Sequence, residues 1–160
     1  MELDKEKLKN FDKLPADVRR QFSLLMNRYA EKKKQSKVKE NFMAFVKHVW
    51  PDFIEGRHHK EVAEKFNEIA NGKTKRVIIN MAPRHTKSEF ASYLLPAWMV
   101  GRNPKLKIIQ STNTTELSVR FGRKAKALMD SPEYKEVFQT RLKEDSQAAG
   151  KWETQQGGEY

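Results

Sequence analysis

The sequence predicts an α/β fold, with a parallel-sheet core of the nucleotide-binding kind preceded by an N-terminal helical region. Three observations lead to this class. The apolar run at residues 77–79 is followed by a polar loop and then by a helical pattern that begins near Ser88. A second apolar pair, Ile108 and Ile109, follows that helix, as the next strand does in a right-handed strand–helix–strand unit. Upstream of both, apolar residues recur at helical spacing.

Residues 1–40 are expected to form a basic helical arm. The first fourteen residues are charged with scattered apolar positions, so we expect them to fray. Pro15 suits the start of a helix. The apolar face of this helix is predicted to comprise Val18, Phe22, Leu25, Met26 and Tyr29. Residues 31–40 are rich in Lys and have no apolar periodicity, which is typical of a solvated helix end or a linker.

Two further helices are predicted before the loop. The first, residues 42–50, carries an aromatic and aliphatic stripe and ends at Pro51. The second runs over about residues 60–70 and is closed by an Asn-Gly pair. His58 and His59 lie between these helices. No Cys or carboxylate at ligand spacing accompanies the pair, so solvent-exposed imidazoles at a helix N-terminus are favoured over a metal site.

The segment from residue 76 to residue 89 has the layout of a phosphate-binding loop: a buried strand, a tight loop, Lys87 and Ser88, and a helix N-terminus. Lys87 would neutralise charge on the terminal phosphates, and the Ser88 hydroxyl would bind Mg²⁺. The two glycine positions of the usual G-x-x-x-x-G-K-[ST] pattern hold Met81 and Thr86, so the loop loses some access to positive φ. The alternative is an ordinary strand–turn–helix with an exposed Lys.

The remaining elements follow from periodicity and turn signals. In chain order we predict a helix over 88–100 with a kink or early end at Pro96, a parallel strand over 105–111, a helix from Thr114 or Thr115, a short helix over 131–138, an irregular stretch over 141–150, and a strand over 151–154 with its turn at 155–158. Four basic side chains lie mostly off the apolar face of the helix from Thr114, namely Arg120, Arg123, Lys124 and Lys126. A solvated surface is favoured there over a stripe that faces DNA.

Composition restricts the partners. The 160 residues suffice for one domain with a core, and no apolar stretch approaches the ~18 residues of a membrane span. The N-terminus is not a secretory signal. The chain has no cysteine, which excludes disulfides and thiolate metal sites and fits a reducing cytoplasm. Its net charge of +11 points to polyanionic partners, nucleic acid first, with a Lys-rich solubilising surface as the alternative.

Three segments of the sequence resemble one known protein family. Residues 82–89, Ala-Pro-Arg-His-Thr-Lys-Ser-Glu, resemble the deviant Walker A loop of the large terminase subunits of tailed bacteriophages, in which Pro-Arg-His-Gly-Lys-Ser is a common spelling. Thr86 stands where that family usually has Gly. Residues 53–66 (FIEGRHHKEVAEKF) resemble the segment before the loop, and residues 151–160 (KWETQQGGEY) resemble a Trp-x-Thr-x-x-Gly-Gly stretch. The resemblance covers roughly residues 41–160.

This resemblance implies that residues 41–160 are the N-terminal part of an incomplete P-loop NTPase domain. It implies an ATP-driven motor that threads viral DNA into a procapsid, with a nuclease in the full-length protein. The implied cofactors are ATP and Mg²⁺, and the implied adenine contacts are His58 and His59. Lys87 and Arg84 would be catalytic and Ser88 would bind the metal. The nucleotide would be held by Pro83, Arg84, His85, Thr86, Lys87, Ser88 and Glu89.

The implied partners are double-stranded viral DNA, a small terminase subunit and a portal protein, on which the chain could form a homo-oligomer. The implied location is the host cytoplasm, transiently at the procapsid portal.

Hydrolysis by such a loop also needs a strand that ends in acids, which hold Mg²⁺ and orient water. Asp130 belongs to an amphipathic helix, and the acids at residues 144–145 follow no apolar run. We therefore expect the Walker B strand and the nuclease domain to lie beyond Tyr160. The alternatives are a non-catalytic basic module that binds DNA and another helicase-like P-loop motor. The pair Lys87–Ser88 argues against the first, which has no need of it.

Overall fold

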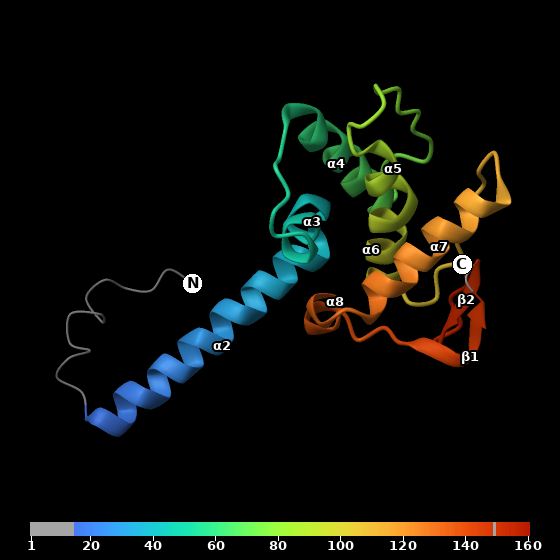
Figure 1. Cartoon of the computed structure of the whole chain (residues 1–160). Coiled ribbons are helices and arrows are strands. Elements are labelled where there is room, and N and C mark those ends of the chain that lie inside the picture. The colour runs from blue at the N-terminus through green and yellow to red at the C-terminus, as the bar shows by residue number, and fades with distance from the viewer. Residues whose placement is uncertain (1–14, 149) are drawn as a thin grey trace. The chain divides into compact units, whose positions relative to one another are not determined.

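The computed structural model describes residues 15–148 and 150–160, and these are mostly helical (Figure 1). The chain divides into two compact units, Met1–Ser36 and Lys37–Tyr160, which are described separately. The predicted fraying of residues 1–14 lies outside the described residues. Within the described part, no helix is both long enough and apolar enough to cross a membrane.

The described part of the first unit is a single helix, α2 (Ala16–Glu40), whose last four residues belong to the second unit. The Lys-rich tract therefore continues the predicted helix. Lys37 and Lys39 in its last turn complement the negative end of the helix dipole. The predicted apolar face remains largely uncovered, since Leu25 and Tyr29 are 64% and 56% exposed. No second element of this unit is described that would bury it.

The second unit buries one aromatic-rich core between its helices. These are α3 (Phe42–Val49), α4 (Arg57–Ala70), α5 (Lys87–Glu89), η2 (Phe90–Leu94), α6 (Leu95–Arg102), α7 (Thr115–Asp130) and α8 (Pro132–Val137). Phe42 has no exposed surface and meets Phe66, Phe90 and Trp98 edge-on at 5.1–5.5 Å between ring centres. Trp98 is also fully buried and donates its indole N–H to the Val38 carbonyl at 3.1 Å. The helices predicted from apolar stripes are thus confirmed.

Local capping explains where these helices begin. Asn41 accepts the Ala44 N–H at the start of α3, and Thr114 accepts the Leu117 N–H at the start of α7. Ser131 does the same for α8.

The helical backbone runs without a break from Lys87 to Arg102. A π-helical turn, η2, precedes Pro96, which then falls in the first turn of α6, where its missing N–H is tolerated. The predicted early end at Pro96 is therefore wrong.

The predicted parallel-sheet core is also wrong. Among the described residues the only sheet is antiparallel, and it has two strands, β1 (Leu142–Ala148) and β2 (Lys151–Thr154). Residues 77–79 join no strand, and residues 105–111 contribute one isolated parallel bridge, between Lys107 and Glu159. An apolar run forms a buried strand only where neighbouring strands and covering helices exist. Ile78 and Ile109 have no such cover and are 89% and 98% exposed.

The sheet and its C-terminal turn clamp the extended segment that follows α6. Thr154 is fully buried, donates its hydroxyl to the Pro104 carbonyl and accepts the Gly158 N–H at 2.8 Å. Glu159 donates its N–H to the Leu106 carbonyl at 3.1 Å and accepts the Ile108 N–H at 2.8 Å. The predicted strand over 151–154 and its turn are confirmed. The stretch over 141–150, predicted to be irregular, instead supplies strand β1.

Candidate functional site

The loop before α5 adopts a left-handed conformation at two positions that are not glycine. Arg84 has φ 64° and Thr86 has φ 58°. Thr86 is the N-cap of α5, and its carbonyl accepts the Phe90 N–H at 2.9 Å. Non-glycine residues rarely adopt positive φ, and β-branched ones least of all. The missing glycines therefore do not prevent the loop from reaching positive φ, although the backbone there is strained.

The loop presents its polar groups to solvent. Pro83, Arg84, His85, Lys87 and Ser88 are all exposed, and Thr86 is half-buried. The Lys87 amine turns back over the loop and donates to the Met81 carbonyl at 3.3 Å. Ser88 lies in the first turn of the helix beside it. The two side chains predicted to bind phosphate and metal are thus adjacent and accessible.

Histidines from α4 meet the loop, which the sequence did not reveal. His59 lies 27 residues before Thr86, yet its Nε2 is 2.6 Å from the Thr86 hydroxyl oxygen. Its ring packs against Phe53 and Phe90, and it is only 8% exposed. The prediction of an exposed imidazole is therefore wrong for His59. His58 lies between it and His85, with ring centres 3.8 Å and 5.5 Å away.

The electrostatics of this cluster oppose protonation of His59. Burial lowers the pKa of the His59 imidazole below its ordinary value, and the nearby His58 and His85 lower it further, while Glu55 acts in the opposite direction. The described residues contain no group of three His, Cys, Asp or Glu side chains that could hold a metal ion. A metal bound at Ser88 would therefore need ligands from outside this set, such as phosphate oxygens.

The acid nearest in sequence to Ser88 is already paired. The Glu89 carboxylate lies 3.7 Å from the Lys124 amine of α7, and this amine also sits over the Tyr93 ring at 5.1 Å. Lys124 is a neighbour of the loop helix that sequence reasoning missed, because the contact spans two helices. It lines a shallow cavity of about 520 Å³ on α7 together with Arg120 and Arg123.

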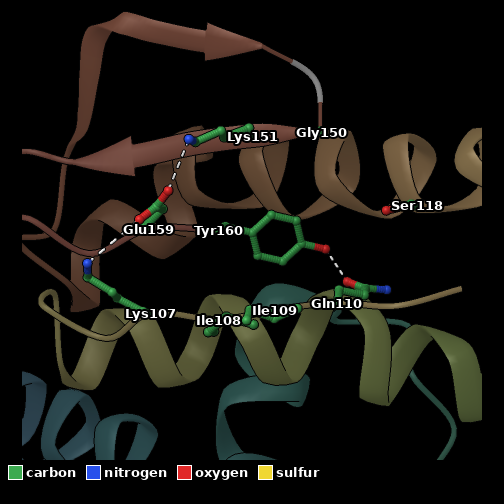
Figure 2. Close-up of a pocket in the computed structure, with 9 residues that line it drawn as sticks. All are labelled: Lys107, Ile108, Ile109, Gln110, Ser118, Gly150, Lys151, Glu159 and Tyr160. Atoms are coloured by element: carbon green, nitrogen blue, oxygen red, sulfur yellow. Dashed lines mark hydrogen bonds and ion pairs between the residues drawn. The ribbon is translucent and has the colours of Figure 1, made fainter.

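A second cavity, of about 420 Å³, lies beside the C-terminal residues and contains none of the predicted site residues (Figure 2). Glu159 sits between the Lys151 and Lys107 amines, at 3.2 Å and 3.8 Å, and the Tyr160 hydroxyl donates to the Gln110 side-chain oxygen. The Glu159 carboxylate is thus shared by two lysine amines and offsets one of their two positive charges. We interpret these contacts as part of the clamp on the extended segment, and not as a binding site.

Comparison of the chain with protein-family models, with curated proteins and with solved structures finds no match. The interpretation of the site therefore rests on its residues and their geometry.

Proposed function

We propose that the chain binds ATP with Mg²⁺ through residues 83–88, as the ATPase part of a terminase-like motor for viral DNA. The observation that carries this proposal is the pairing of exposed Lys87 and Ser88 at the junction between a left-handed loop and a helix. The proposal concerns this loop and does not require the parallel sheet that the sequence predicted.

The loop backbone supplies a suitable environment for phosphate oxygens. Alternation of left-handed residues with others turns successive N–H groups toward one side, which creates a concave anion site. The first N–H groups of the helix that begins at Lys87 also have no partner within the helix. Arg84, exposed on the same loop, adds a cation that we assign to the γ-phosphate.

Each side chain has a distinct role in this proposal. Lys87 exchanges its long contact with the neutral Met81 carbonyl for a charge-assisted contact with the β- and γ-phosphates. The Ser88 hydroxyl completes the coordination of Mg²⁺, which prefers oxygen ligands and several waters. Glu89 is held by Lys124 and so is not placed to activate water. We therefore expect nucleotide binding with slow turnover by residues 1–160.

The motor assignment rests on the resemblance of the loop and of residues 151–160 to the terminase pattern. We propose double-stranded DNA as the main partner, with a small terminase subunit and a portal protein as protein partners. The net charge of +11 and the basic cavity on α7 support DNA as a ligand. They equally favour the second candidate function, a basic DNA-binding module that turns over no nucleotide.

The test compares wild-type protein with Lys87→Ala and Lys105→Ala in titrations with a fluorescent ATP analogue and Mg²⁺. Both variants lose one positive charge. Lys105 is exposed and lies beyond the far end of the helical segment 87–102, roughly 24 Å from the loop at 1.5 Å per residue. Loss of a charge-assisted phosphate contact costs about 1.5–3 kcal/mol, which is roughly 10- to 150-fold in Kd.

We expect Lys87→Ala to weaken binding by this factor and Lys105→Ala to leave it nearly unchanged. Equal affinities for wild-type protein and Lys87→Ala would contradict the proposal. Equal weakening in both variants would mean that binding reflects the overall charge of the chain and not the loop.

A further inference from the structure

The strained residue Thr86 has a hydrogen-bond partner outside the loop. Its backbone has φ 58° and ψ 10°, a region that β-branched residues seldom occupy. Its hydroxyl oxygen lies 2.6 Å from His59 Nε2 and 2.7 Å from the His85 carbonyl oxygen. One neighbour belongs to the loop and the other to α4, so this side chain ties the loop to a helix.

Hydrogen-bond roles fix the protonation state of the imidazole in this arrangement. The Gly56 N–H donates to His59 Nδ1 at 2.9 Å, so Nδ1 must be the unprotonated nitrogen. The neutral ring therefore carries its proton on Nε2 and donates it to the Thr86 hydroxyl. That hydroxyl then donates its own proton to the His85 carbonyl. These three hydrogen bonds therefore run in one direction, from Gly56 through His59 and Thr86 to His85. Each of these polar groups has a hydrogen-bond partner.

The surroundings hold the His59 ring in place. It is 8% exposed and its centre lies 4.8 Å from that of Phe53 and 5.3 Å from that of Phe90. Phe90 belongs to the same continuous helix as Lys87 and Ser88. The ring therefore has little freedom to move away, and its N–H is a fixed donor aimed at the loop.

We propose that His59 is a positioning residue that holds Thr86 in its left-handed conformation and thereby sets the geometry of the phosphate-binding loop. This inference rests on the proposed function, since the loop must bind phosphate for its geometry to affect affinity. Thr86 needs this support because its β-branched side chain disfavours a positive φ. A glycine at position 86 reaches positive φ without help, so the need for His59 should disappear with the side chain.

The test is a double-mutant cycle on nucleotide affinity with His59→Ala, Thr86→Gly and the double variant. We expect His59→Ala to weaken binding about tenfold, as for one lost hydrogen bond to a strained group. In the Thr86→Gly background the same change should alter affinity by less than about twofold. A direct contact of His59 with the adenine would instead give the same tenfold loss in both backgrounds, and that result would overturn the proposal.

Two further measurements cover the case in which His59→Ala fails to fold. Thr86→Val keeps the β-branched shape but removes the hydroxyl, so it should weaken binding as His59→Ala does. Nitrogen-15 NMR of the wild-type protein should show the Nε2–H tautomer of His59, with the ring signals shifted in Thr86→Val. An Nδ1–H tautomer would overturn the proposal.

The NMR measurement needs no nucleotide, and it separates the two ideas. Absence of ATP binding together with the Nε2–H tautomer would refute the proposed function and leave the contact from His59 to Thr86 standing. ATP binding that requires Lys87, together with equal effects of His59→Ala in both backgrounds, would refute only the positioning role.

Discussion

Single residues decide the local geometry at two places in the second unit. At the loop, His59 and Thr86 hold a strained backbone. At the C-terminal turn, Gly158 is buried and a Cβ on it would lie 2.8 Å from the Leu106 carbonyl oxygen and closer still to that of Pro104. Backbone atoms cannot move aside cheaply, so this position requires glycine for close approach and not for its φ.

Gly158→Ala should therefore destabilise the second unit by about 2–4 kcal/mol, because the new methyl would displace the segment that the clamp holds. The exposed Gln156 in the same turn offers a matched control, and Gln156→Ala should change the free energy of unfolding by less than about 0.5 kcal/mol. Urea unfolding followed by circular dichroism measures both. Equal stability of the two variants would contradict the close approach.

His59 also predicts a pH dependence of stability. Its pKa is lowered in the folded state by burial first, and its ordinary value is about 6.5. At pH values between the folded and the ordinary pKa, the unfolded chain binds more protons at His59 than the folded chain does. The contribution of His59 to the free energy of unfolding is therefore complete above about pH 6.5 and is lost as the pH falls through the folded pKa. Urea unfolding at pH 7.5 and at pH 5.5 should show a larger loss for wild-type protein than for His59→Gln, which cannot titrate. The same loss in both would assign the effect to other groups.

Sequence patterns predicted the helices well and the strands poorly, for a physical reason. A helix satisfies its own backbone, so the stripe of α3 and the caps at Thr114 and Ser131 suffice to specify it. A strand needs a neighbour that a local pattern does not reveal. Residues 77–79 look like a strand but pair with nothing described, whereas the charged stretch Leu142–Ala148 pairs with β2.

In the candidate site, too, residues adjacent in sequence were predicted and contacts between distant segments were not. Local sequence predicts the pair Lys87–Ser88, through the helical pattern that follows it and the resemblance of residues 82–89. The contacts of His59 with Thr86 and of Lys124 with Glu89 join segments 27 and 35 residues apart, and nothing in either local sequence indicates them. A histidine pair without further ligands is ambiguous until its neighbours are known.

Burial alternates along residues 76–80 and 105–110 as it does along a strand, although neither segment belongs to a strand. Ile79 and Ile108 pack against the core, while their neighbours Ile78 and Ile109 are 89% and 98% exposed. Exposed apolar side chains beside an incompletely paired backbone favour association between chains.

The double variant Ile78→Thr/Ile109→Thr should therefore lower self-association and binding of a hydrophobic dye, with little change in thermal stability. Ile54→Thr is the matched control, because Ile54 is 88% exposed but lies in the connection between α3 and α4. Light scattering against protein concentration measures the effect. The idea fails if Ile54→Thr reduces scattering as much as the double variant does.

Across the complete chain, the excess of positive charge predicts DNA binding through phosphates. Log K should fall linearly with log[salt], with a slope of about −0.9 for each phosphate neutralised. Arg120→Gln/Arg123→Gln should reduce the steepness by up to about 1.8 if both arginines of the α7 cavity contact phosphates. Lys32→Gln/Lys33→Gln removes the same charge from α2 and serves as control. Salt-independent binding would argue against DNA as the partner, and equal slopes in both variants would argue against α7 as its site.

The three tryptophans of the chain, Trp50, Trp98 and Trp152, all lie in the second unit, and the last two have no exposed surface. The Trp152 ring stacks on Tyr160 with 4.7 Å between ring centres, and Trp98 belongs to the buried core. Tryptophan emission during unfolding consequently reports on Lys37–Tyr160 alone, while the far-ultraviolet helical signal also includes α2. The gap between the two melting curves is thus an optical measure of how independently the basic arm loses its helix.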